Sequence, residues 1–492
     1  MRAQREALVI WDCGATNTTV SLVGTNGRVF ATASRPTTAE RHEDGLIWPL
    51  DRFWENFCDL TRQLLDEHRC AVRAVNITTF GVCWGAISPD DRLVYPVISW
   101  KCTRTREQVR WAEQHLDLDL IFLQTGAPPF HFNTAFSLRW IRDHRPEVLK
   151  TAETFLMMPQ LFVHRLTGER VAERTMATTT MLFDLHRKEW ANDLFEAFEV
   201  PNKFPQEVGS PGEVVGTVTA QAAEATGIPQ GTPVCAGGHD TVVATAGACR
   251  DLRSDPLFST GTWSLLVRTH DQYQVRLEDR RRNMPWQLNP HAEGVLGGYN
   301  NQGHMIGGLA FDLVRKLFLP EASAAEATEV AAKVPPGSHG VYINPTFVAG
   351  TGPNPEAPSA LVGWEDGLPP ETAVRAVLES LAYQTRDCLE YMQGEVSSIL
   401  IGGGFAKNRL FAQILADVTG RRVELAGIPE VTTLGAAVLA MVGAGIVSDV
   451  QEAWKAIAMP TETFTPNPQA MEVYEPLYRR HRRLIEALGS GI

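Results

Sequence analysis

The sequence predicts an α/β protein of two lobes with a cleft between them, and three observations support this expectation. Each half contains one polar, glycine-bearing turn between apolar runs, at 12–17 and at 259–263. The chain has 492 residues, more than one domain usually holds, so two domains of about 200 to 250 residues are expected. Hydrophobic residues make up 44% of the chain, which is ample for two packed cores. We therefore expect a first lobe over 1–248 and a second over 249–492.

The turn at 12–17 is expected to join two strands, because it lies between the apolar runs 7–11 and 20–23. Its small residues would let backbone N–H groups approach phosphate oxygens, and its hydroxyl and amide groups add donors. Its carboxylate suits Mg²⁺ or the water shell of that ion. An ordinary hairpin is the alternative, since the same residue types dominate turns in general. The candidate ligands in this turn are Asp12, Gly14, Thr16 and Asn17.

The rest of the first lobe alternates between strand and helix patterns. A helix is expected over about 50–68, where apolar residues recur at helical spacing. Residues 103–190 are expected to be mostly helical, and prolines and glycines then mark a loop-rich passage. The other strands expected in this lobe are 29–34, 74–78, 93–95 and 97–98.

The end of the first lobe carries a candidate base. An apolar strand beginning at Pro233 meets two glycines, and His239 and Asp240 then open a helix-like stretch. Asp240 fits a plain N-cap, which is a common role for aspartate. The same position near helix N–H groups would also keep the carboxylate ionised and aim it into a cleft, as a general base requires. The sequence alone leaves both interpretations open.

Two segments of the second lobe are candidates for nucleotide contact. The turn at 259–263 repeats the polar character of the first turn, with Gly261 and Thr262 as candidate phosphate donors. Later, a short strand at 398–401 runs into the glycines 402–404, where a flat ring or a ribose could lie against backbone. This run completes neither the dinucleotide fingerprint nor a P-loop. A tight strand-to-helix turn without a ligand is the alternative.

Other segments of the second lobe are expected to be structural. The charged stretch 276–282 fits a solvated turn better than an anion site. A long helix is expected from 369–371, where proline and glutamate are favourable start signals, and an apolar helix over 432–444.

Composition limits the class of partner. The formal net charge is −12 and the pI is about 5.6, which gives no electrostatic footprint for nucleic acid or for an anionic membrane. The eight cysteines show no C-x-x-C spacing, which argues against a zinc site and a disulfide scaffold. The first apolar run stops at Asp12, too short for a secretory signal, and no run reaches the ~20 apolar residues of a membrane span. We expect a cytoplasmic protein that acts on small molecules.

Together these segments resemble the FGGY carbohydrate kinases, within the actin, hexokinase and heat-shock ATPase superfamily, over roughly 9–445. Within that family the chain looks most like the L-fuculokinases and next like the L-rhamnulokinases. The segments that carry this closer likeness are 78–82, 98–102 with Arg104 and Thr105, 132–134 and 299–300.

The resemblance implies two ribonuclease-H-like lobes and in-line phosphoryl transfer from ATP, with Mg²⁺, to a ketose or deoxyketose such as L-fuculose. Three alternatives stay open: a kinase for another sugar or polyol, such as L-rhamnulose, ribulose or xylulose; a non-catalytic sugar or nucleotide sensor on the same fold; and an actin-like assembly protein. A small-molecule sugar and ATP are the expected partners, without nucleic acid or membrane. The oligomeric state is left open, with a homodimer as one option.

Roles for single residues follow as expectations. Asp240 would be the general base, and Asp12 would hold Mg²⁺ through water. The phosphates would be held by Gly14, Thr16, Asn17, Gly261 and Thr262, and adenosine by Gly403, Gly404 and Asn408. The sugar contacts would be Trp84, Lys101, Arg104, His239, Asp240 and Asn300. Lys101 and Arg104 could equally be surface charges, and His239 could be a structural histidine.

One position departs from the expected pattern. Fuculokinase-like chains carry an aspartate after the Phe-Gly-Val run, and here that residue is Cys83. A site that pairs with sugar hydroxyls discriminates strongly, so the loss of one acceptor could shift the preferred sugar.

Overall fold

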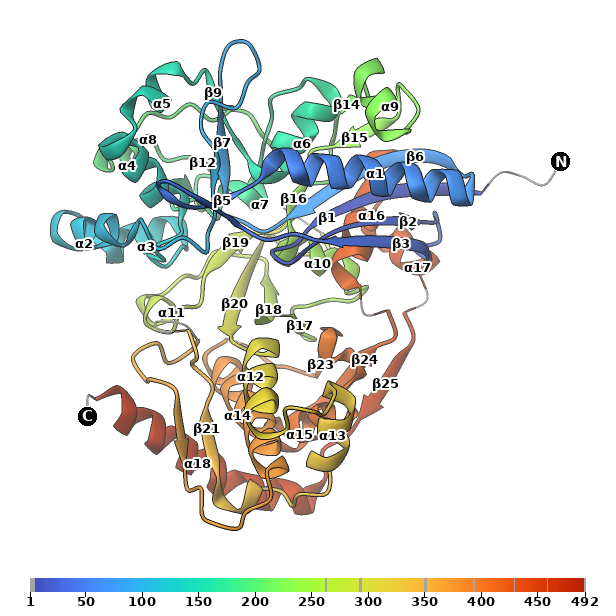
Figure 1. The fold of residues 1–492 in the computed structure, drawn as a ribbon. Coiled ribbons are helices and arrows are strands. Elements are labelled where there is room, and N and C mark those ends of the chain that lie inside the picture. The colour runs from blue at the N-terminus through green and yellow to red at the C-terminus, as the bar shows by residue number, and fades with distance from the viewer. Residues whose placement is uncertain are drawn as a thin grey trace.

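Two lobes make up the molecule, with the amino-terminal half above and most of the carboxyl-terminal half below in Figure 1. The computed structural model describes residues 5–261, 263–291, 294–348, 352–392, 394–428, 430–457 and 459–490. Within this described part of the chain, each lobe is built on a seven-stranded sheet. The predicted two-lobed α/β fold is confirmed. Among the described helices, none has the length and apolar character needed to cross a membrane.

The first sheet has the order β14-β15-β6-β1-β2-β3, and β16 also pairs with β6. Its strands are β1 (Glu6–Cys13), β2 (Asn17–Val23), β3 (Val29–Pro36), β6 (Ala71–Thr79), β14 (Val214–Thr217), β15 (Pro233–Cys235) and β16 (Gly238–His239). β1 and β16 both run parallel to β6, so that Asp12 and Gly238 each pair with Thr78. The carboxyl ends of these three strands therefore meet at one edge of the sheet, where open α/β sheets bind ligands.

The second sheet repeats this arrangement, in the order β19-β20-β18-β17-β23-β24-β25. Its strands are β17 (Leu257–Thr260), β18 (Ser264–His270), β19 (Trp286–Leu288), β20 (Tyr299–Met305), β23 (Ser398–Gly403), β24 (Arg422–Ala426) and β25 (Thr461–Phe464). β17 runs parallel to β23, and Thr260 pairs with Gly403. The two glycine turns of this lobe therefore lie side by side at the carboxyl ends of β17 and β23.

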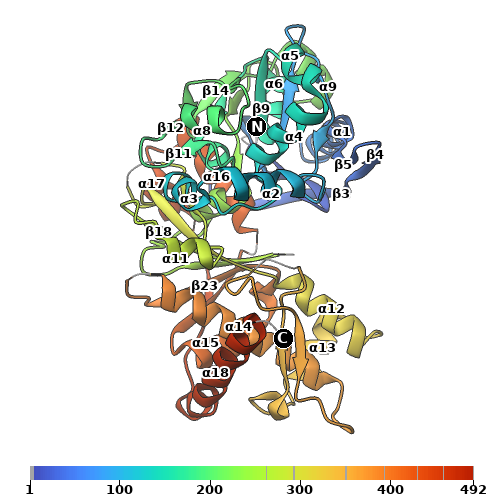
Figure 2. The ribbon, with the colours of Figure 1, turned by 90° about the vertical axis from the view of Figure 1, so that its left-hand side faces the viewer.

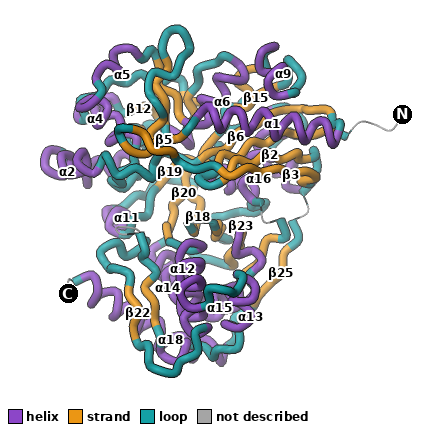
Figure 3. Tube along the Cα trace, in the orientation of Figure 1, coloured by secondary structure: helices purple, strands orange, loops and turns teal. Residues whose placement is uncertain are grey.

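Alternation along β1 explains how the first sheet is covered on both faces. Val9 and Trp11 pack on the side of α1 (Leu50–His68), where the Trp11 ring stacks on Phe57 at 4.6 Å. Leu8 and Ile10 face the opposite side and pack against α16 (Val431–Gly443). Figure 3 shows helices α1 and α16 on either side of these strands.

Smaller elements fill the remainder of the first lobe. Its other helices are α2 (Arg106–His115), α3 (Leu118–Thr125), α4 (Thr134–His144), α5 (Pro146–Thr151), α6 (Met158–Thr167), α7 (Arg174–Ala177), α8 (Asn192–Ala197) and α9 (Ala220–Thr226). Its short strands are β4 (Glu40–His42), β5 (Gly45–Trp48), β7 (Trp84–Ile87), β8 (Val97–Ile98), β9 (Thr154–Met157), β10 (Ala172–Glu173), β11 (Phe183–Asp184), β12 (Glu189–Trp190) and β13 (Val208–Gly209). The strand predicted at 93–95 is reduced to a bridge between Leu93 and Ile87, and β7 forms instead.

Helices surround the second sheet. They are α11 (Leu277–Arg281), α12 (Gly308–Phe318), α13 (Ala324–Ala331), α14 (Glu371–Tyr391), α15 (Arg409–Thr419) and α18 (Pro468–Gly489), with the strand pair β21 (Tyr342–Asn344) and β22 (Ala360–Val362). The charged stretch predicted as a solvated turn forms α11, and its Arg280 donates to Asp119 of the first lobe at 2.6 Å. This stretch therefore joins the lobes.

Two helices cross at the junction of the lobes, with a glycine of each at the point of closest approach. They are α10 (Asp240–Gly247) and α16, and a Cβ added at Gly247 would lie 2.6 Å from the backbone nitrogen of Gly435. α16 and the following α17 (Val450–Ala456) lie with the first lobe, as Figure 2 shows, and Asn76 of β6 donates to the Ala436 carbonyl at 2.9 Å. The sequence placed this region in the second lobe, because it follows the strands of that lobe along the chain.

Candidate active site

A cavity of about 650 Å³ lies between the lobes, at the edges where the parallel strands of both sheets end. Asp12 and Asp240 line it from the first lobe, and Gly261 and Gly403 line it from the second. The structure thus brings both predicted carboxylates and both predicted glycine turns to one space. Concave sites of this size with a few converging polar groups are typical of small-molecule binding.

The two carboxylates differ in environment. Asp12 lies at the end of β1, and its pKa is raised to about 7, chiefly by burial and further by the negative charge of Asp240. Asp240 begins α10, and its side chain is 34% exposed. Its Oδ1 accepts from the backbone N–H of Thr241 at 2.6 Å, which orients the carboxylate at the helix end.

The paired glycine turns of the second lobe are tied together by one hydroxyl. Thr260 Oγ1 donates to the Gly402 carbonyl at 2.6 Å and accepts from the Phe405 N–H at 2.8 Å. Gly403 has φ +78°, and a Cβ there would lie 2.9 Å from the Thr260 carbonyl carbon. Only glycine fits this close approach. Gly404 follows at the exposed start of a short 3₁₀ turn, Gly404–Lys407.

The first polar turn has the predicted hairpin form. Gly14 N–H donates to the Asn17 carbonyl at 2.9 Å, and the side chains of Thr16 and Asn17 are exposed. Thr262, the predicted donor of the second turn, lies outside the described residues. Gly261 donates its N–H to the Trp263 carbonyl at 2.8 Å, so that amide is already paired in this structure.

Asn408, the predicted adenosine contact, caps a helix instead of lining the cavity wall. Its Oδ1 accepts from the Phe411 N–H at 2.9 Å, at the start of α15. The cap uses one lone pair of this oxygen, so its second lone pair and the amide nitrogen are the groups that could contact a nucleotide.

Three predicted sugar contacts lie behind the cavity wall. Trp84 is 7% exposed, and its indole N–H donates to Ser137 Oγ at 2.7 Å inside the helical core of the first lobe. The Arg104 guanidinium donates to the Leu46 carbonyl at 3.0 Å and lies over the Trp140 ring. These placements argue against direct sugar contacts by Trp84 and Arg104. The third residue, Asn300, is fully buried behind Gln287 and Gln302, which do line the cavity.

His239 and Lys101 lie closer to the cavity. His239 lines it, with Nε2 at 3.3 Å from Asp240 Oδ1. Lys101 Nζ donates to the Ala15 carbonyl at 2.9 Å and lies over the Trp100 ring, and both of these neighbours line the cavity. The Lys101 side chain is therefore held at the rim by the first polar turn.

Cys83, the position that departs from the expected aspartate, lies in the core. It is 3% exposed, and burial raises the pKa of its thiol to about 12. The neighbouring Phe80, Gly81 and Val82 line the cavity instead. Cys83 can therefore influence a bound sugar through these neighbours, and through Trp100, whose backbone it contacts.

Several cavity residues were not singled out from the sequence. Aromatic rings form much of the wall, namely Trp100, Phe130, Phe132, Trp263 and His304. Phe130 stacks on Phe132 with ring centroids 5.0 Å apart, and His304 lies parallel to Phe130 at 6.2 Å. Trp100 lies inside the segment 98–102 that carries the resemblance and could have been found there. Phe132 and Trp263 likewise lie inside the segments 132–134 and 259–263 named above. Phe130 and His304 come from a loop and a strand whose meeting no local pattern indicates.

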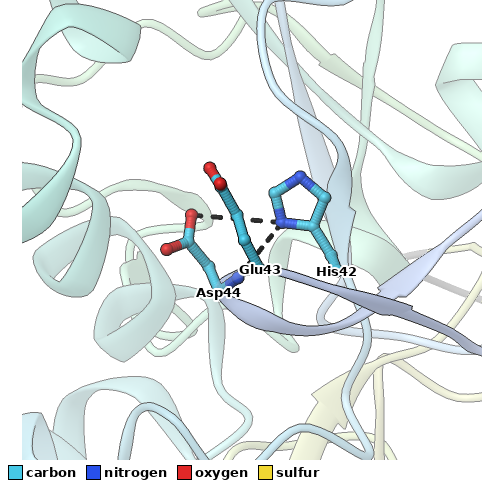
Figure 4. Close-up of side chains that lie close together, drawn as sticks. All are labelled: His42, Glu43 and Asp44. Carbon is cyan, nitrogen blue, oxygen red and sulfur yellow. Dashed lines mark hydrogen bonds and ion pairs between the residues drawn. The ribbon is translucent and has the colours of Figure 1, made fainter.

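A second group of titratable side chains lies away from this cavity. The side chains of His42, Glu43 and Asp44 lie close together (Figure 4), with possible ligand atoms within 4.8 Å of one another. Asp44 already accepts from the Tyr95 hydroxyl and from Arg145 Nη2, each at 2.6 Å. Both oxygens of the Asp44 carboxylate therefore already accept hydrogen bonds. None of the three residues lines the cavity described above.

A buried glutamate, Glu173, is linked to the backbone of His239 through the Thr175 hydroxyl. Glu173 accepts from the N–H of Thr175 at 2.7 Å and from its hydroxyl at 2.7 Å, and Thr175 Oγ1 accepts from the His239 N–H at 2.9 Å. Burial raises the pKa of Glu173 to about 7, against the lowering effect of these hydrogen bonds.

We expect this glutamate to make stability fall with rising pH. The folded protein favours the protonated carboxyl, so stability is lost as pH rises from the unfolded pKa near 4.5 to about 7. A Glu173→Gln variant should remove about 3 kcal/mol of pH-dependent stability, visible as a smaller drop in melting temperature between pH 5 and pH 8. Equal drops in both proteins would contradict this role.

The fold and the cavity define a two-lobed phosphotransferase with carboxylates facing glycine turns across a cleft. Residues 7–247 match the N-terminal domain and residues 257–444 the C-terminal domain of the FGGY family of carbohydrate kinases, and the chain belongs to that family. It is an ATP-dependent sugar kinase, a phosphotransferase with an alcohol group as acceptor.

Individual relatives differ in what they are named for. The chain is 29% identical over 479 residues to an L-fuculokinase of Escherichia coli (strain K12), covering 95% of this chain and 98% of that protein. It is 28% identical over 378 residues to a glycerol kinase of Thermococcus kodakarensis, covering 75% and 74%. A ligand-bound xylulose kinase structure from Lactobacillus acidophilus has a TM-score of 0.89 at 20% identity over 99% of each chain, which shows the shared fold.

Proposed function

We propose that this kinase phosphorylates a ketose or deoxyketose of the L-fuculose type at its terminal hydroxyl, with Asp240 as general base. The observation that carries the proposal is the position of Asp240, which opens α10 in the cavity wall across from the glycine turns at Gly261 and Gly403. The similarity to L-fuculokinases over almost the whole chain supports the sugar class. We also propose a division of the chain near residue 248, with α16 and α17 returning to the first lobe.

In the proposed reaction the sugar hydroxyl attacks the γ-phosphorus in line, through a loose transition state. Asp240 accepts the hydroxyl proton as the bond to phosphorus forms. The Gly14 and Gly261 amides are already paired, so the exposed Thr16 hydroxyl and Asn17 amide are the groups that stabilise the charge spreading over the phosphate oxygens. The aromatic wall excludes water, which would otherwise accept the phosphoryl group.

A magnesium ion fits the polar end of this cavity. The pKa of Asp12 is raised to about 7 by burial and by Asp240, so a divalent cation nearby would restore the ionised carboxylate. When bound, Mg²⁺ would neutralise the charge of the ATP phosphates. Asp12 would hold it through its water shell.

The sugar itself is tested by a product screen. ADP release should be followed with L-fuculose, L-rhamnulose, D-ribulose, D- and L-xylulose and polyols including glycerol, and the phosphorylated carbon assigned by ³¹P NMR. We expect the highest kcat/KM with L-fuculose or a close deoxyketose. Preference for glycerol or xylulose would overturn the proposed L-fuculose type of substrate and would still support a kinase function. No product from any of these compounds would favour a sensor.

Replacing Asp12 with asparagine should raise the Mg²⁺ concentration needed for half-maximal activity by about 10- to 100-fold, the usual weight of an outer-shell carboxylate. Asp66→Asn, on the exposed face of α1, is the matched control and should leave the Mg²⁺ dependence unchanged. An unchanged Mg²⁺ dependence in Asp12→Asn would remove Asp12 from the metal site.

A further inference from the structure

A series of hydrogen-bonded side chains runs through the second lobe to His239. It begins at Asn289, whose amide nitrogen faces three main-chain carbonyl oxygens. These belong to Leu296, Gly297 and Tyr299, at 2.6, 3.3 and 2.9 Å. Carbonyl oxygens only accept hydrogen bonds, so this end of the side chain must be the NH₂ group. The backbone therefore fixes the orientation of the Asn289 amide.

Each following amide is oriented by the one before it. Asn289 Oδ1 must accept, so Asn300 presents its Nδ2 to it at 2.8 Å. Asn300 Oδ1 then accepts from Gln302 Nε2 at 2.7 Å. The same nitrogen of Gln302 donates to Gln287 Oε1 at 2.8 Å, which establishes that oxygen as an acceptor.

His239 receives the end of this series. Its Nδ1 lies 3.1 Å from Gln287 Oε1, an acceptor, so Nδ1 must carry a proton. Burial lowers the pKa of His239 below its usual value, although Asp240 and Gln287 act in the opposite direction. A neutral ring has one N–H, and with that proton on Nδ1 the other nitrogen, Nε2, is left as an acceptor.

The free acceptor lies beside the proposed base. Nε2 of His239 and Oδ1 of Asp240 are 3.3 Å apart, and both residues line the cavity. Asp240 Oδ1 already accepts from the Thr241 N–H at 2.6 Å and from the Thr241 hydroxyl at 3.2 Å. A donor to Nε2 would relieve the repulsion between the two neighbouring acceptors. Their separation is comparable to that of two hydroxyl oxygens on neighbouring carbon atoms of a sugar.

We propose that His239 Nε2 accepts a hydrogen bond from the sugar hydroxyl next to the one that faces Asp240. The four amides of the series are positioning residues that hold the ring in the required tautomer, and they are Gln287, Asn289, Asn300 and Gln302. This inference rests on the proposed sugar kinase function and narrows its substrate. The carbon next to the phosphorylated one must carry a hydroxyl. In L-fuculose the terminal hydroxyl is on C1, and the neighbouring C2 carries a hydroxyl only in the cyclic hemiketal form. The inference therefore selects that form over the open-chain ketone, which offers no donor to His239.

The series also joins the two lobes. His239 ends β16 in the first lobe, whereas Gln287 and Gln302 lie on β19 and β20 in the second. The tautomer of a first-lobe histidine is thus set by the second lobe, and the acceptor is defined only when the lobes are together. This arrangement explains why Asn300, fully buried and away from the cavity wall, belongs to the sugar site.

The tautomer can be measured directly in the sugar-free full-length chain labelled with ¹⁵N-histidine. The signals of His239 are assigned by their loss in His239→Gln. We expect a protonated Nδ1 and an unprotonated Nε2 at neutral pH, and in Gln287→Met a shift of the proton to Nε2, where it can donate to Asp240. A wild-type ring with its proton on Nε2, or with two protons, would overturn the inference.

Kinetic measurements distinguish loss of the His239 orientation from general disruption of the fold. Gln287→Met should lower kcat/KM for the sugar by about 10-fold, the loss expected for one hydrogen bond, with KM for ATP unchanged. Asn301→Leu is the matched control, because Asn301 lies on the paired strand β20 and its amide donates to the carbonyls of Met284 and Pro285 instead. An equal loss in both variants would assign the effect to general disruption of the β19–β20 pair and overturn the positioning role.

Failure of this inference and failure of the proposed function are distinguishable, since the tautomer is measured without sugar. Sugar phosphorylation together with a proton on Nε2 would contradict the proposed positioning role of the four amides and would still support the kinase function. A proton on Nδ1 without phosphorylation of any sugar would confirm the predicted tautomer of His239 and contradict its proposed role in binding a sugar substrate.

Discussion

Replacing Asp240 with asparagine should lower kcat by about 100-fold or more, the typical weight of general-base catalysis. The change removes the proton acceptor and keeps the shape of the side chain. It also keeps an oxygen able to accept from the Thr241 N–H, so the start of α10 should persist. Single-turnover assays with the best sugar of the screen measure the chemical step directly.

Binding measurements separate loss of chemistry from loss of the site. Titration calorimetry of Asp240→Asn with sugar and with ATP should give dissociation constants within a few-fold of wild type. The exposed Asp66→Asn variant should keep full turnover. Near-normal turnover in Asp240→Asn would leave the general-base assignment without support and return Asp240 to the role of a helix-start residue.

Local patterns predicted the elements that position the site. The turn at 12–17 joins β1 and β2, and the helix expected at 50–68 is α1. The strand expected at 398–401 is β23, which continues through Gly402 and Gly403, and Gly404 begins the 3₁₀ turn. In each case the signal lies in residues adjacent in sequence: a period of apolar positions, or glycine at a sharp turn. Parallel pairing then brings the turns together, because strands running in one direction end at one edge.

Side-chain direction was harder to predict, as the run around Trp84 shows. Successive residues of a strand point to opposite faces, and in β7 Trp84 faces the helical core with Phe155. Cys83 packs on the other side, with Trp48. The alternation could be predicted from the sequence, but which face meets the sugar depends on β9 and α6, which pack against this strand.

Contacts between distant segments account for the rest. The positive charge of Arg104 suggested a contact with a ligand. In the structure its guanidinium instead contacts the Leu46 carbonyl and the Trp140 ring, both far away in sequence, and it has a structural role. Gln287 and Gln302 carry no motif, and only the pairing of β19 with β20 brings them beside His239. The return of α16 to the first lobe likewise depends on a helix crossing that apolar periodicity does not encode.

That crossing leads to the second large expected effect. Gly247→Ala should place a Cβ 2.6 Å from the Gly435 nitrogen and closer still to the Val431 carbonyl oxygen, so α10 and α16 must move apart. Overpacking of this kind costs about 1–3 kcal/mol of stability. Asp240 begins α10 and Val431 begins α16, and both line the cavity. A displacement of about 1 Å can cost 10²-fold in rate, so kcat should fall by about that factor even where the protein remains folded.

A helical glycine with room around it is the matched control. Gly489, at the end of α18, has its nearest neighbour at 3.7 Å, an ordinary contact distance, so Gly489→Ala should keep both melting temperature and turnover. Melting temperature and kcat are to be measured for both variants and for Gly435→Ala, whose Cβ would meet the Val243 carbonyl carbon at 2.8 Å from the opposite side of the crossing. Because both collisions separate the same two helices, Gly247→Ala and Gly435→Ala should lose activity together. Full turnover in either variant would show that the helices can separate without moving Asp240, and the crossing would then contribute to stability alone.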